Sequence, residues 1–360
     1  MSGRLNFLFR HHHHHHHLSK RPTTWNSCRR FCSSTVPEPK SRTEEEKDPA
    51  PIFFDRYVQQ LLMTLTRIDY RKVFAARRDG TRLNVPKYKF MTDEELQQAR
   101  AQIEAKAKGR IQMPPVVKIR SENVEILSDD PGLQDFTETT NVVFTDISFG
   151  GNNRNRLIVV REPSGTLRHA TSNERHRMNQ VYFPIQGREV HTPQMFRDPY
   201  LNDLLKREEF EFVLDRACLQ FEPDDPEYHR VTREVYSRLN ALKKFDTLRS
   251  TRHFGPFAFH LAWEKSMDAL LVDLLKNHDT EEAAALIRLY HRIHPEAESA
   301  KEPIRDDIDL IRAYAELDSS KRNMITNAIK VHQTLLEQKN KMKEGLMKAH
   351  GFQDEEIEQT

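Results

Sequence analysis

The sequence is poor in cysteine and has no long apolar run. Its 360 residues include three cysteines, Cys28, Cys32 and Cys218, which are too few for a disulfide framework. The longest apolar stretch, around residues 257–263, is interrupted by His260 and falls short of the roughly 18 consecutive apolar residues that cross a bilayer. These shortages indicate a reducing or thiol-tolerant compartment and predict no membrane span.

The motifs that usually carry catalysis are also missing. No glycine-rich loop ends in Gly-Lys-Ser or Gly-Lys-Thr, and Gly150, Gly151 and Gly165 do not form a dinucleotide-binding turn. Neither His-Glu-x-x-His nor Gly-x-Ser-x-Gly occurs. Cys218 lies on an apolar stripe, which favours a buried inert thiol over a nucleophile. We therefore predict that the protein is not an enzyme and has no cofactor.

Histidine and cysteine do not form a metal-binding pattern. Cys28 and Cys32 follow a run from His11 to His17, but a second ligand pair at the spacing of a structural zinc site is missing. The histidine run is either native low-complexity sequence or an added tag, and it carries no fold information. His291 and His294 lie where a predicted helix ends, so we favour a helix-dipole interaction over a metal site.

Acidic residues are absent from the first 36 positions. This segment contains six Lys or Arg and many Ser and Thr. Leu5, Leu8 and Phe9 fall on one helical face, which is typical of a presequence for import into the mitochondrial matrix. We expect cleavage near Phe31 to Ser33, with a disordered basic tail as the alternative.

Loss of this segment changes the sign of the net charge. The whole chain has 56 Lys and Arg against 54 Asp and Glu. Six of the basic residues lie in residues 1–36, which leaves 50 against 54 and a formal charge of −4. Autonomous RNA-binding domains usually have a pI above about 9, because phosphate neutralisation supplies most of their affinity. The composition favours a protein that contacts other proteins widely and RNA only through local basic patches.

The most informative region lies between residues 138 and 184. Asn141–Phe149 (NVVFTDISF) and Arg156–Glu162 (RLIVVRE) are rich in β-branched and aromatic residues, and Pro-Ser-Gly precedes TLRHA after the second run. This order predicts strand, tight turn and strand, with Gly165 free to take a positive φ. We expect the β portion of the chain to lie within residues 113–170.

A helix is predicted directly after this hairpin. Thr171 can cap it, and Glu174 can reach back to complete a capping box. Pro184 then ends the helix. The apolar stripe expected on this helix consists of Met178, Val181 and Tyr182.

The rest of the chain predicts helices by apolar spacing and capping residues. Thr92 with Glu95 opens a helix that runs to about Lys108 and ends at Gly109. Before it, an amphipathic helix is expected on Phe54, Tyr57, Val58, Leu61, Leu62, Leu65 and Ile68. Later stripes are Phe210, Val213, Leu214, Ala217, Cys218 and Phe221; then Tyr228, Val231, Val235, Leu239 and Leu242; then Met267, Leu270, Leu271, Leu274 and Leu275.

Three more features concern the C-terminal part. Asp279 and Thr280 open a helix at its positive end. Asp306, Asp307 and Asp309 resemble the acidic first turn of another helix. The last helix is expected to start at Ser319 or Ser320 and to run to His350, with Met324, Ala328, Val331, Leu335 and Met342 at alternating spacings of four and three.

These elements define a fold class and a set of segments. The fold is predicted to be mainly α with a small β module, in which an α-hairpin stack follows the β-hairpin-containing segment. The segments are a presequence with the His tract (1–36), a disordered linker (37–52), N-terminal helices (53–112), a β-containing module (113–190), a helical array ending in a long helix (191–350) and a flexible tail (351–360).

Two locally basic patches are candidates for contact with RNA or protein. We call the patch on the β-hairpin and its following helix the hairpin patch; its members are Arg154, Arg156, Arg161, Arg168, Arg175 and Arg177. The second patch consists of Lys243, Lys244, Arg249 and Arg252. Phe245, Phe254 and Phe257 are interleaved with it, and we favour core positions for these rings over base stacking.

Several sequence words occur in an order that resembles a known family. They are ETT, VFTDIS, VVREPSGTLR and QVYFP within residues 138–184, MPPV at 113–116, QFEPD at 220–224, LRSTRHFG at 248–255 and LYHRIHP at 289–295. Together they cover roughly residues 52 to 315 and resemble a mitochondrion-specific family of the animal small ribosomal subunit, numbered twenty-two. The resemblance implies a structural constituent on the lower body of that subunit, with a role in its assembly and in mitochondrial translation.

Sequence and resemblance together give one functional hypothesis and one alternative. The hypothesis is a ribosomal constituent in the mitochondrial matrix that contacts neighbouring ribosomal proteins, touches rRNA through the basic patches and is not a stand-alone homo-oligomer. The alternative is a matrix adaptor that binds RNA or a translation factor without being a ribosomal constituent.

Overall fold

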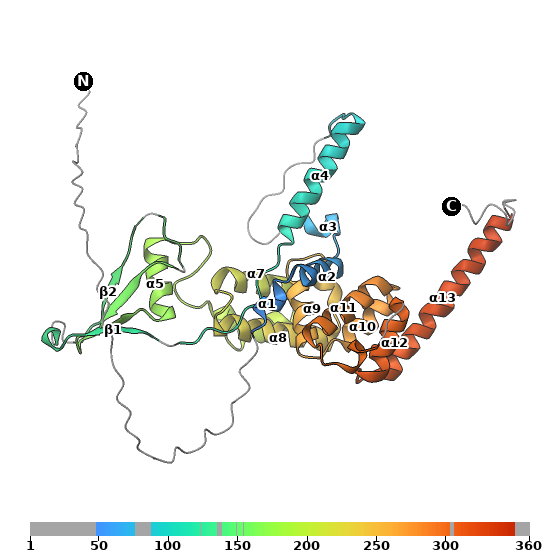
Figure 1. Cartoon of the computed structure of the whole chain (residues 1–360). Coiled ribbons are helices and arrows are strands. Elements are labelled where there is room, and N and C mark those ends of the chain that lie inside the picture. Colours follow the sequence, from blue (N-terminus) through green and yellow to red (C-terminus); the bar gives the residue numbers. More distant parts are fainter. Residues whose placement is uncertain are drawn as a thin grey trace, which may run out of the picture. The chain divides into compact units, whose positions relative to one another are not determined.

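The computed structural model describes residues 48–75, 88–122, 124–134, 139–148, 150–153, 155–302 and 306–349. Within them lie thirteen α-helices and a four-stranded sheet (Figure 1). The predicted fold class, mainly α with a small β module, is confirmed. The predicted presequence, the His tract, Cys28, Cys32 and the C-terminal tail lie outside the described residues.

The sheet is antiparallel throughout, with strand order β1-β4-β3-β2. Its strands are β1 (Ile126–Asp129), β2 (Val142–Thr145), β3 (Ile158–Arg161) and β4 (Thr166–His169). The predicted strand–turn–strand is β3–β4, and Gly165 in its turn has a φ of +91°. This prediction is confirmed, because glycine adopts a positive φ without a steric penalty.

The sequence misplaced the outer strand. Residues 116–119 (VVKI), which we included in the β portion, have no regular secondary structure, and the strand at this side of the sheet is β1. All four residues of β1 are exposed, so no alternation of apolar and polar side chains marks it in the sequence.

Helix α5 (Ser172–Tyr182) follows the sheet as predicted. The Thr171 hydroxyl accepts from the Glu174 amide, and the Glu174 carboxylate accepts from the Thr171 amide, which completes the capping box. The predicted apolar stripe is wrong, because Val181 and Tyr182 are 62% and 53% exposed. The side chains that α5 buries are instead the polar Asn179 and Gln180.

The N-terminal helices begin and end at other residues than predicted. They are α1 (Ala50–Phe53), α2 (Arg56–Thr66), α3 (Tyr70–Val73) and α4 (Asp93–Arg110). The chain breaks before α2, because the Asp55 carboxylate accepts from the Tyr57 amide and caps that helix. The capping box of α4 is confirmed, but the helix continues through Gly109, and its large apolar side chains Leu96 and Ile103 are exposed.

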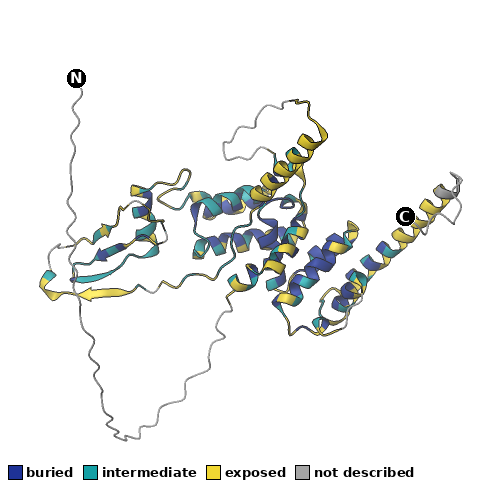
Figure 2. Cartoon of the chain, turned by 45° about the horizontal axis from the view of Figure 1, so that its top comes forward, coloured by how far each residue is buried: buried dark blue, intermediate teal, exposed yellow. Residues whose placement is uncertain are grey.

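The C-terminal helices and α2 share one apolar core. The helices are α6 (Tyr200–Lys206), α7 (Phe210–Gln220), α8 (Pro226–Leu242), α9 (Phe254–Trp263), α10 (Asp268–Lys276), α11 (Thr280–Ile293), α12 (Asp307–Leu317) and α13 (Arg322–Ala349). α2 packs against α9 and α11, α10 against α11 and α13, and α7 against α8. Figure 2 shows the buried residues concentrated in these helices, while α4, β1 and the outer part of α13 are exposed.

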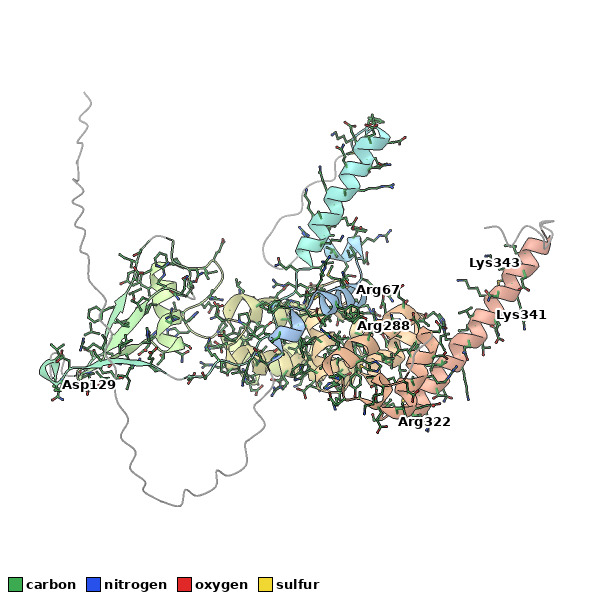
Figure 3. The ribbon with its side chains drawn as sticks, viewed as in Figure 1. Arg67, Asp129, Arg288, Arg322, Lys341 and Lys343 are labelled. Atoms are coloured by element: carbon green, nitrogen blue, oxygen red, sulfur yellow. The ribbon has the colours of Figure 1, made fainter. Side chains whose placement is uncertain are left out.

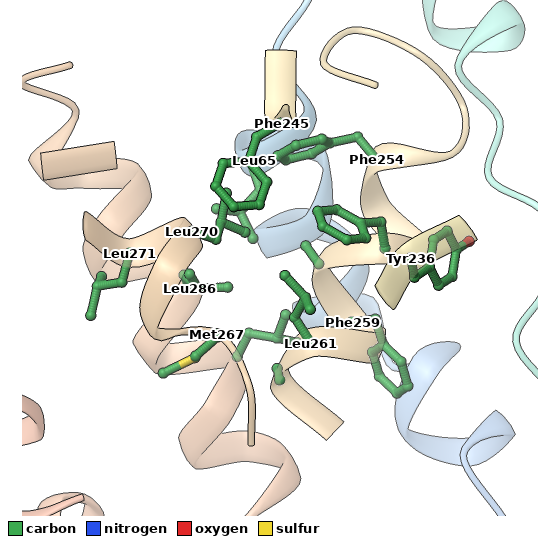
Figure 4. Packing of buried hydrophobic residues seen from close by; sticks show 14 of the residues in the cluster. Leu65, Tyr236, Phe245, Phe254, Phe259, Leu261, Met267, Leu270, Leu271 and Leu286 are labelled. Carbon is green, nitrogen blue, oxygen red and sulfur yellow. The ribbon is translucent and has the colours of Figure 1, made fainter. Parts of the chain in front are cut away.

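Helix α9 lies at the centre of this core. Eight of its ten residues are buried, and Figure 4 shows Phe254, Phe259 and Leu261 near Leu65 of α2 and Leu286 of α11. The predicted stripes on α7 and α10 are confirmed, and their side chains join the same core, except that Cys218 is only partly buried. The acidic start of α12 is also confirmed, since Asp306 caps it.

Candidate functional site

Arg156, a member of the hairpin patch, is buried beneath its own loop. Its guanidinium donates to the carbonyls of Asp146, Ser148 and Gly151 at 2.9, 3.1 and 2.6 Å and lies 3.6 Å from the centroid of the Phe183 ring. The residue is 4% exposed. Arginine suits this position because its planar fork can serve several carbonyls while stacking on an aromatic face.

Three more arginines of the hairpin patch bind groups of the protein itself. Arg161 donates to the carbonyl of Gly165 at 2.9 Å, and Arg175 donates to the carbonyl of Arg156 at 2.6 Å. Arg168 pairs through two nitrogens with both oxygens of Glu174, at 2.9 and 3.1 Å, and also binds Glu162 at 2.7 Å. Much of the hairpin patch therefore holds the sheet, its loop and α5 together.

The ion pair between Arg168 and Glu174 changes the ionisation of the carboxylate. Hydrogen bonds from Arg168 are the largest cause that lowers the pKa of Glu174, to about 2, against an opposing effect of burial. The capping bonds from Thr171 lower this pKa further. Glu174 thus stays charged through the physiological range and neutralises Arg168.

One described member of the hairpin patch remains available to a partner. Arg177 is exposed on α5 and makes no hydrogen bond or ion pair among the described residues. Arg154 lies outside the described residues. The described arginines of the hairpin patch therefore fall into two groups: four that bind groups of the protein itself, and Arg177, which is accessible to a partner.

In the second patch, Arg249 is the centre of a buried ion-pair network. It is 8% exposed and lies 2.9 Å from Glu282, 3.4 Å from Asp246 and 3.9 Å from Asp273. Arg67, which follows α2, binds the same Glu282. The network connects the end of α2 with α10 and α11, which are far apart in the sequence.

Arg252 is also bound internally. It donates to Asp215 of α7, as does the buried His253, whose Nε2 lies 2.9 Å from the Asp215 carboxylate. Burial raises the pKa of Asp215, but the hydrogen bond and charge of His253 together with Arg252 outweigh it and bring the pKa to about 2. This ion pair fixes the loop before α9 against α7.

The two lysines of the second patch differ in their contacts. Lys244 lies 3.3 Å from Glu208, whereas Lys243 is exposed and has no partner among the described residues. Phe245, Phe254 and Phe257 are each no more than 1% exposed. The prediction that these rings occupy core positions is confirmed, and none of the three is accessible for stacking with a base.

A polar cleft of about 370 Å³ lies beside α5 and the turn between α7 and α8. Two of its three arginines pair with carboxylates of the same cleft: Arg188 lies 2.8 Å from Glu222, and Arg120 lies 2.8 Å from Asp225. The third, Arg175, donates to the carbonyl of Arg156 at 2.6 Å. No nucleophile and base are paired among the lining residues.

The residues considered for metal binding make other contacts. His291 Nε2 lies 2.7 Å from the Ser299 hydroxyl, and His294 Nε2 lies 3.0 Å from the carbonyl of Ala262. No group of three potential ligands occurs in the part of the chain that the structure describes.

Burial raises the pKa of the Cys218 thiol, which opposes formation of the nucleophilic thiolate.

Sequence reasoning missed an apolar surface on the sheet. Phe144 on β2 is opposite Val159 on β3, while the next pair is Val143 and Val160. Val160 is fully buried, whereas Phe144 is 54% exposed, because side chains alternate between the two faces of a strand. Because successive side chains of VVFT point to opposite faces of the strand, the sequence indicated that Val143 and Phe144 lie on different faces. It did not indicate which of the two faces would be exposed.

No described helix is both long enough and apolar enough to span a membrane. Exposed apolar side chains such as Phe144 are candidates for contact with other macromolecules.

Comparisons with known proteins identify the family. Residues 51–295 match the family described as Mitochondrial 28S ribosomal protein S22. The chain is 38% identical over 309 residues to the small ribosomal subunit protein mS22 of Bos taurus, covering 85% of this chain and 84% of the relative. It is 39% identical over 331 residues to the protein of the same name from Mus musculus, covering 91% and 90%. The chain therefore belongs to the mitochondrial 28S ribosomal protein S22 family.

Proposed function

We propose that this chain is held in the mitochondrial small ribosomal subunit mainly by protein neighbours and touches rRNA through few cations. Family membership gives it the role of a structural constituent of that subunit, in a family of ribosomal proteins and not of enzymes. The proposal adds how the chain is attached, and it places the protein in the mitochondrial matrix, where the presequence-like N-terminus would direct it.

The observation that carries the proposal is the internal use of the predicted RNA-contact residues. Arg156 donates to backbone carbonyls, and Arg168, Arg249 and Arg252 pair with carboxylates of the same chain. A guanidinium bound in this way would have to break those bonds to reach a phosphate. The described cations of the two patches that stay open are Arg177 and Lys243.

Exposed apolar side chains support attachment by proteins. The sheet and α5 expose Phe144, Val181 and Tyr182 to more than half of their full accessible area. Val181 and Tyr182 are adjacent on α5, and neighbouring exposed apolar side chains typically mark protein contacts. Contact with RNA phosphates would not bury these apolar side chains, so it would not remove the free-energy cost of their exposure to water.

The salt dependence of RNA binding tests this proposal. Two phosphate contacts predict that affinity for naked small-subunit rRNA falls only about tenfold between 50 and 200 mM salt, whereas six to ten contacts predict about 10³–10⁵-fold. The assay is a titration of the purified mature chain with this rRNA at several salt concentrations. Tight binding with the steep dependence would contradict the proposal.

Two variants locate the contact. Arg177→Glu combined with Lys243→Glu is expected to remove most of the remaining RNA binding, while co-sedimentation with the small subunit persists because protein contacts hold the chain. The matched control is the exposed Lys276→Glu on α10, outside both patches. Loss of the double variant from the subunit, with the control retained, would show that RNA contacts dominate attachment.

A further inference from the structure

Helix α13 extends beyond the part that packs on its neighbours. Its 28 residues correspond to a length of about 42 Å. Ile325, Ile329 and His332 are buried, and the contacts of α13 are with α10 and α12. Every side chain from Thr334 to Leu346 is exposed. A polar helix segment of this length is marginal in water unless it packs against something.

An apolar stripe runs along α13 on a face distinct from the buried one. Its members are Met324, Val331, Leu335, Met342 and Leu346, which are 46%, 57%, 42%, 75% and 59% exposed. With Ala328 they follow the spacing of four and three that brings side chains onto one seam. Gln338 and Gly345 fall on the same seam and weaken it locally.

Basic side chains border this stripe. In the heptad that places Leu335 and Met342 at position a, Lys339 and Lys341 occupy positions e and g on opposite sides of the seam. Figure 3 shows Lys341 and Lys343 on the exposed half of α13. None of these three lysines makes an ion pair among the described residues.

The charge of the borders decides the kind of partner. A second copy of this chain would leave Lys339 and Lys341 without an acidic partner in either orientation, because no e or g position of α13 carries a carboxylate. Backbone phosphates would satisfy the lysines but would leave Met342 and Leu346 in contact with water and charge. An amphipathic helix with an apolar stripe and acidic borders satisfies both features.

We propose that the exposed half of α13 binds an amphipathic helix of another protein, whose apolar stripe packs on Leu335 and Met342 and whose acidic borders pair with Lys339 and Lys341. This inference rests on the proposed attachment by protein neighbours and names the surface and the chemistry of one of them.

Defined peptides test the recognition directly. The probes are two 28-residue helical peptides with leucine at every a and d position, one with glutamate and the other with lysine at every e and g position. The purified full chain is expected to bind the glutamate peptide about tenfold more tightly, because the two border pairs, at Lys339 and Lys341, change from attractive to repulsive between the probes. Equal affinity for the two peptides would overturn the proposal.

Variants assign this binding to the seam and its borders. Met342→Asp is expected to reduce affinity for the glutamate peptide at least about tenfold, as truncating or charging a central apolar anchor does. Asn340→Asp places the same side chain on the opposite face and is expected to change affinity by less than about twofold. Lys339→Glu with Lys341→Glu should reverse the preference between the peptides. An unchanged affinity in Met342→Asp would overturn the assignment.

Cross-linking in the assembled subunit separates the occupants. A photoreactive side chain at position 342 is expected to cross-link to a helical, net acidic segment of another protein, whereas one at position 340 is not. A cross-link to rRNA, to a second copy of this chain or to nothing would overturn the inference. Because the chain would still sediment with the small subunit in each of those cases, failure here is distinguishable from failure of the proposed function.

Discussion

Replacement of Arg249 by methionine should destabilise the protein strongly. Methionine keeps most of the apolar stem and removes the charge. Arg249 is the cation that faces Glu282 at 2.9 Å, Asp246 at 3.4 Å and Asp273 at 3.9 Å. Both Arg249 and Glu282 have side chains exposed by no more than 10%, so the variant leaves a buried carboxylate with Arg67 as its remaining partner.

The magnitude follows from the loss of one of the two arginines that pair with the buried Glu282. Leaving a buried charge without any partner costs about 3–5 kcal/mol, and because Arg67 stays paired with Glu282 we expect the lower end, about 3 kcal/mol. For a large domain, each kcal/mol lowers Tm by about 2 °C, so the expected loss is roughly 6 °C. Urea denaturation followed by circular dichroism at pH 7 measures the free energy of unfolding. The control Lys243→Met, at the exposed end of the same patch, should stay within about 0.5 kcal/mol of the parent.

The pH dependence of this deficit gives a second check. Burial raises the pKa of Asp273 above its usual value even with Arg249 present. A carboxyl whose folded pKa is raised destabilises the fold above that pKa and ceases to do so as the pH falls through it. Removal of Arg249 raises the folded pKa further, so the deficit should shrink as the pH falls from 7 into the range where Asp273 becomes protonated. A loss below about 1 kcal/mol at pH 7 would refute a structural role for Arg249.

Three further predictions concern the β module. Arg156→Lys should cost about 2–3 kcal/mol in urea denaturation, because one ammonium cannot serve the three carbonyls that the guanidinium binds; a neutral result would contradict its structural role. Because Arg168 lowers the pKa of Glu174 to about 2, the stability that Glu174 contributes is full above pH 4.5 and disappears towards pH 2. The parent should therefore lose about 3 kcal/mol more than Glu174→Gln across that window, and parallel pH profiles would contradict this. Gly165→Ala should cost about 2 kcal/mol or more, because its φ is +91° and a Cβ would lie 2.3 Å from the Asp130 carbonyl oxygen; thermal melts of the two proteins measure this loss.

The sequence was most informative where structure depends on neighbouring residues. The capping boxes at Thr92 and Thr171 formed as predicted, because each requires atoms only three residues apart. The turn at Gly165 follows for the same reason. The predicted apolar stripes on α7 and α10 were confirmed as core, whereas the stripe on α13 is largely exposed.

Long-range packing decided the features that the sequence missed. Helix α9 is buried on nearly all sides, so its sequence has no polar face and therefore no helical periodicity. Conversely, Val181 and Tyr182 of α5 look like core residues but are exposed, because α5 contacts the β module through polar side chains: Glu174 pairs with Arg168, and Asn179 donates to the Asn153 carbonyl. Periodicity identifies an apolar face but does not identify what covers it.

The basic patches show the same division between local and tertiary information. The sequence by itself determined the family, the helices with their own caps and the positions of the arginines. Only the tertiary structure decided that Arg249 would meet Glu282, 33 residues away, and that Arg156 would turn under its own loop. A guanidinium has the same sequence signature whether it binds a phosphate or a carboxylate of its own chain, because the partner is chosen by the fold.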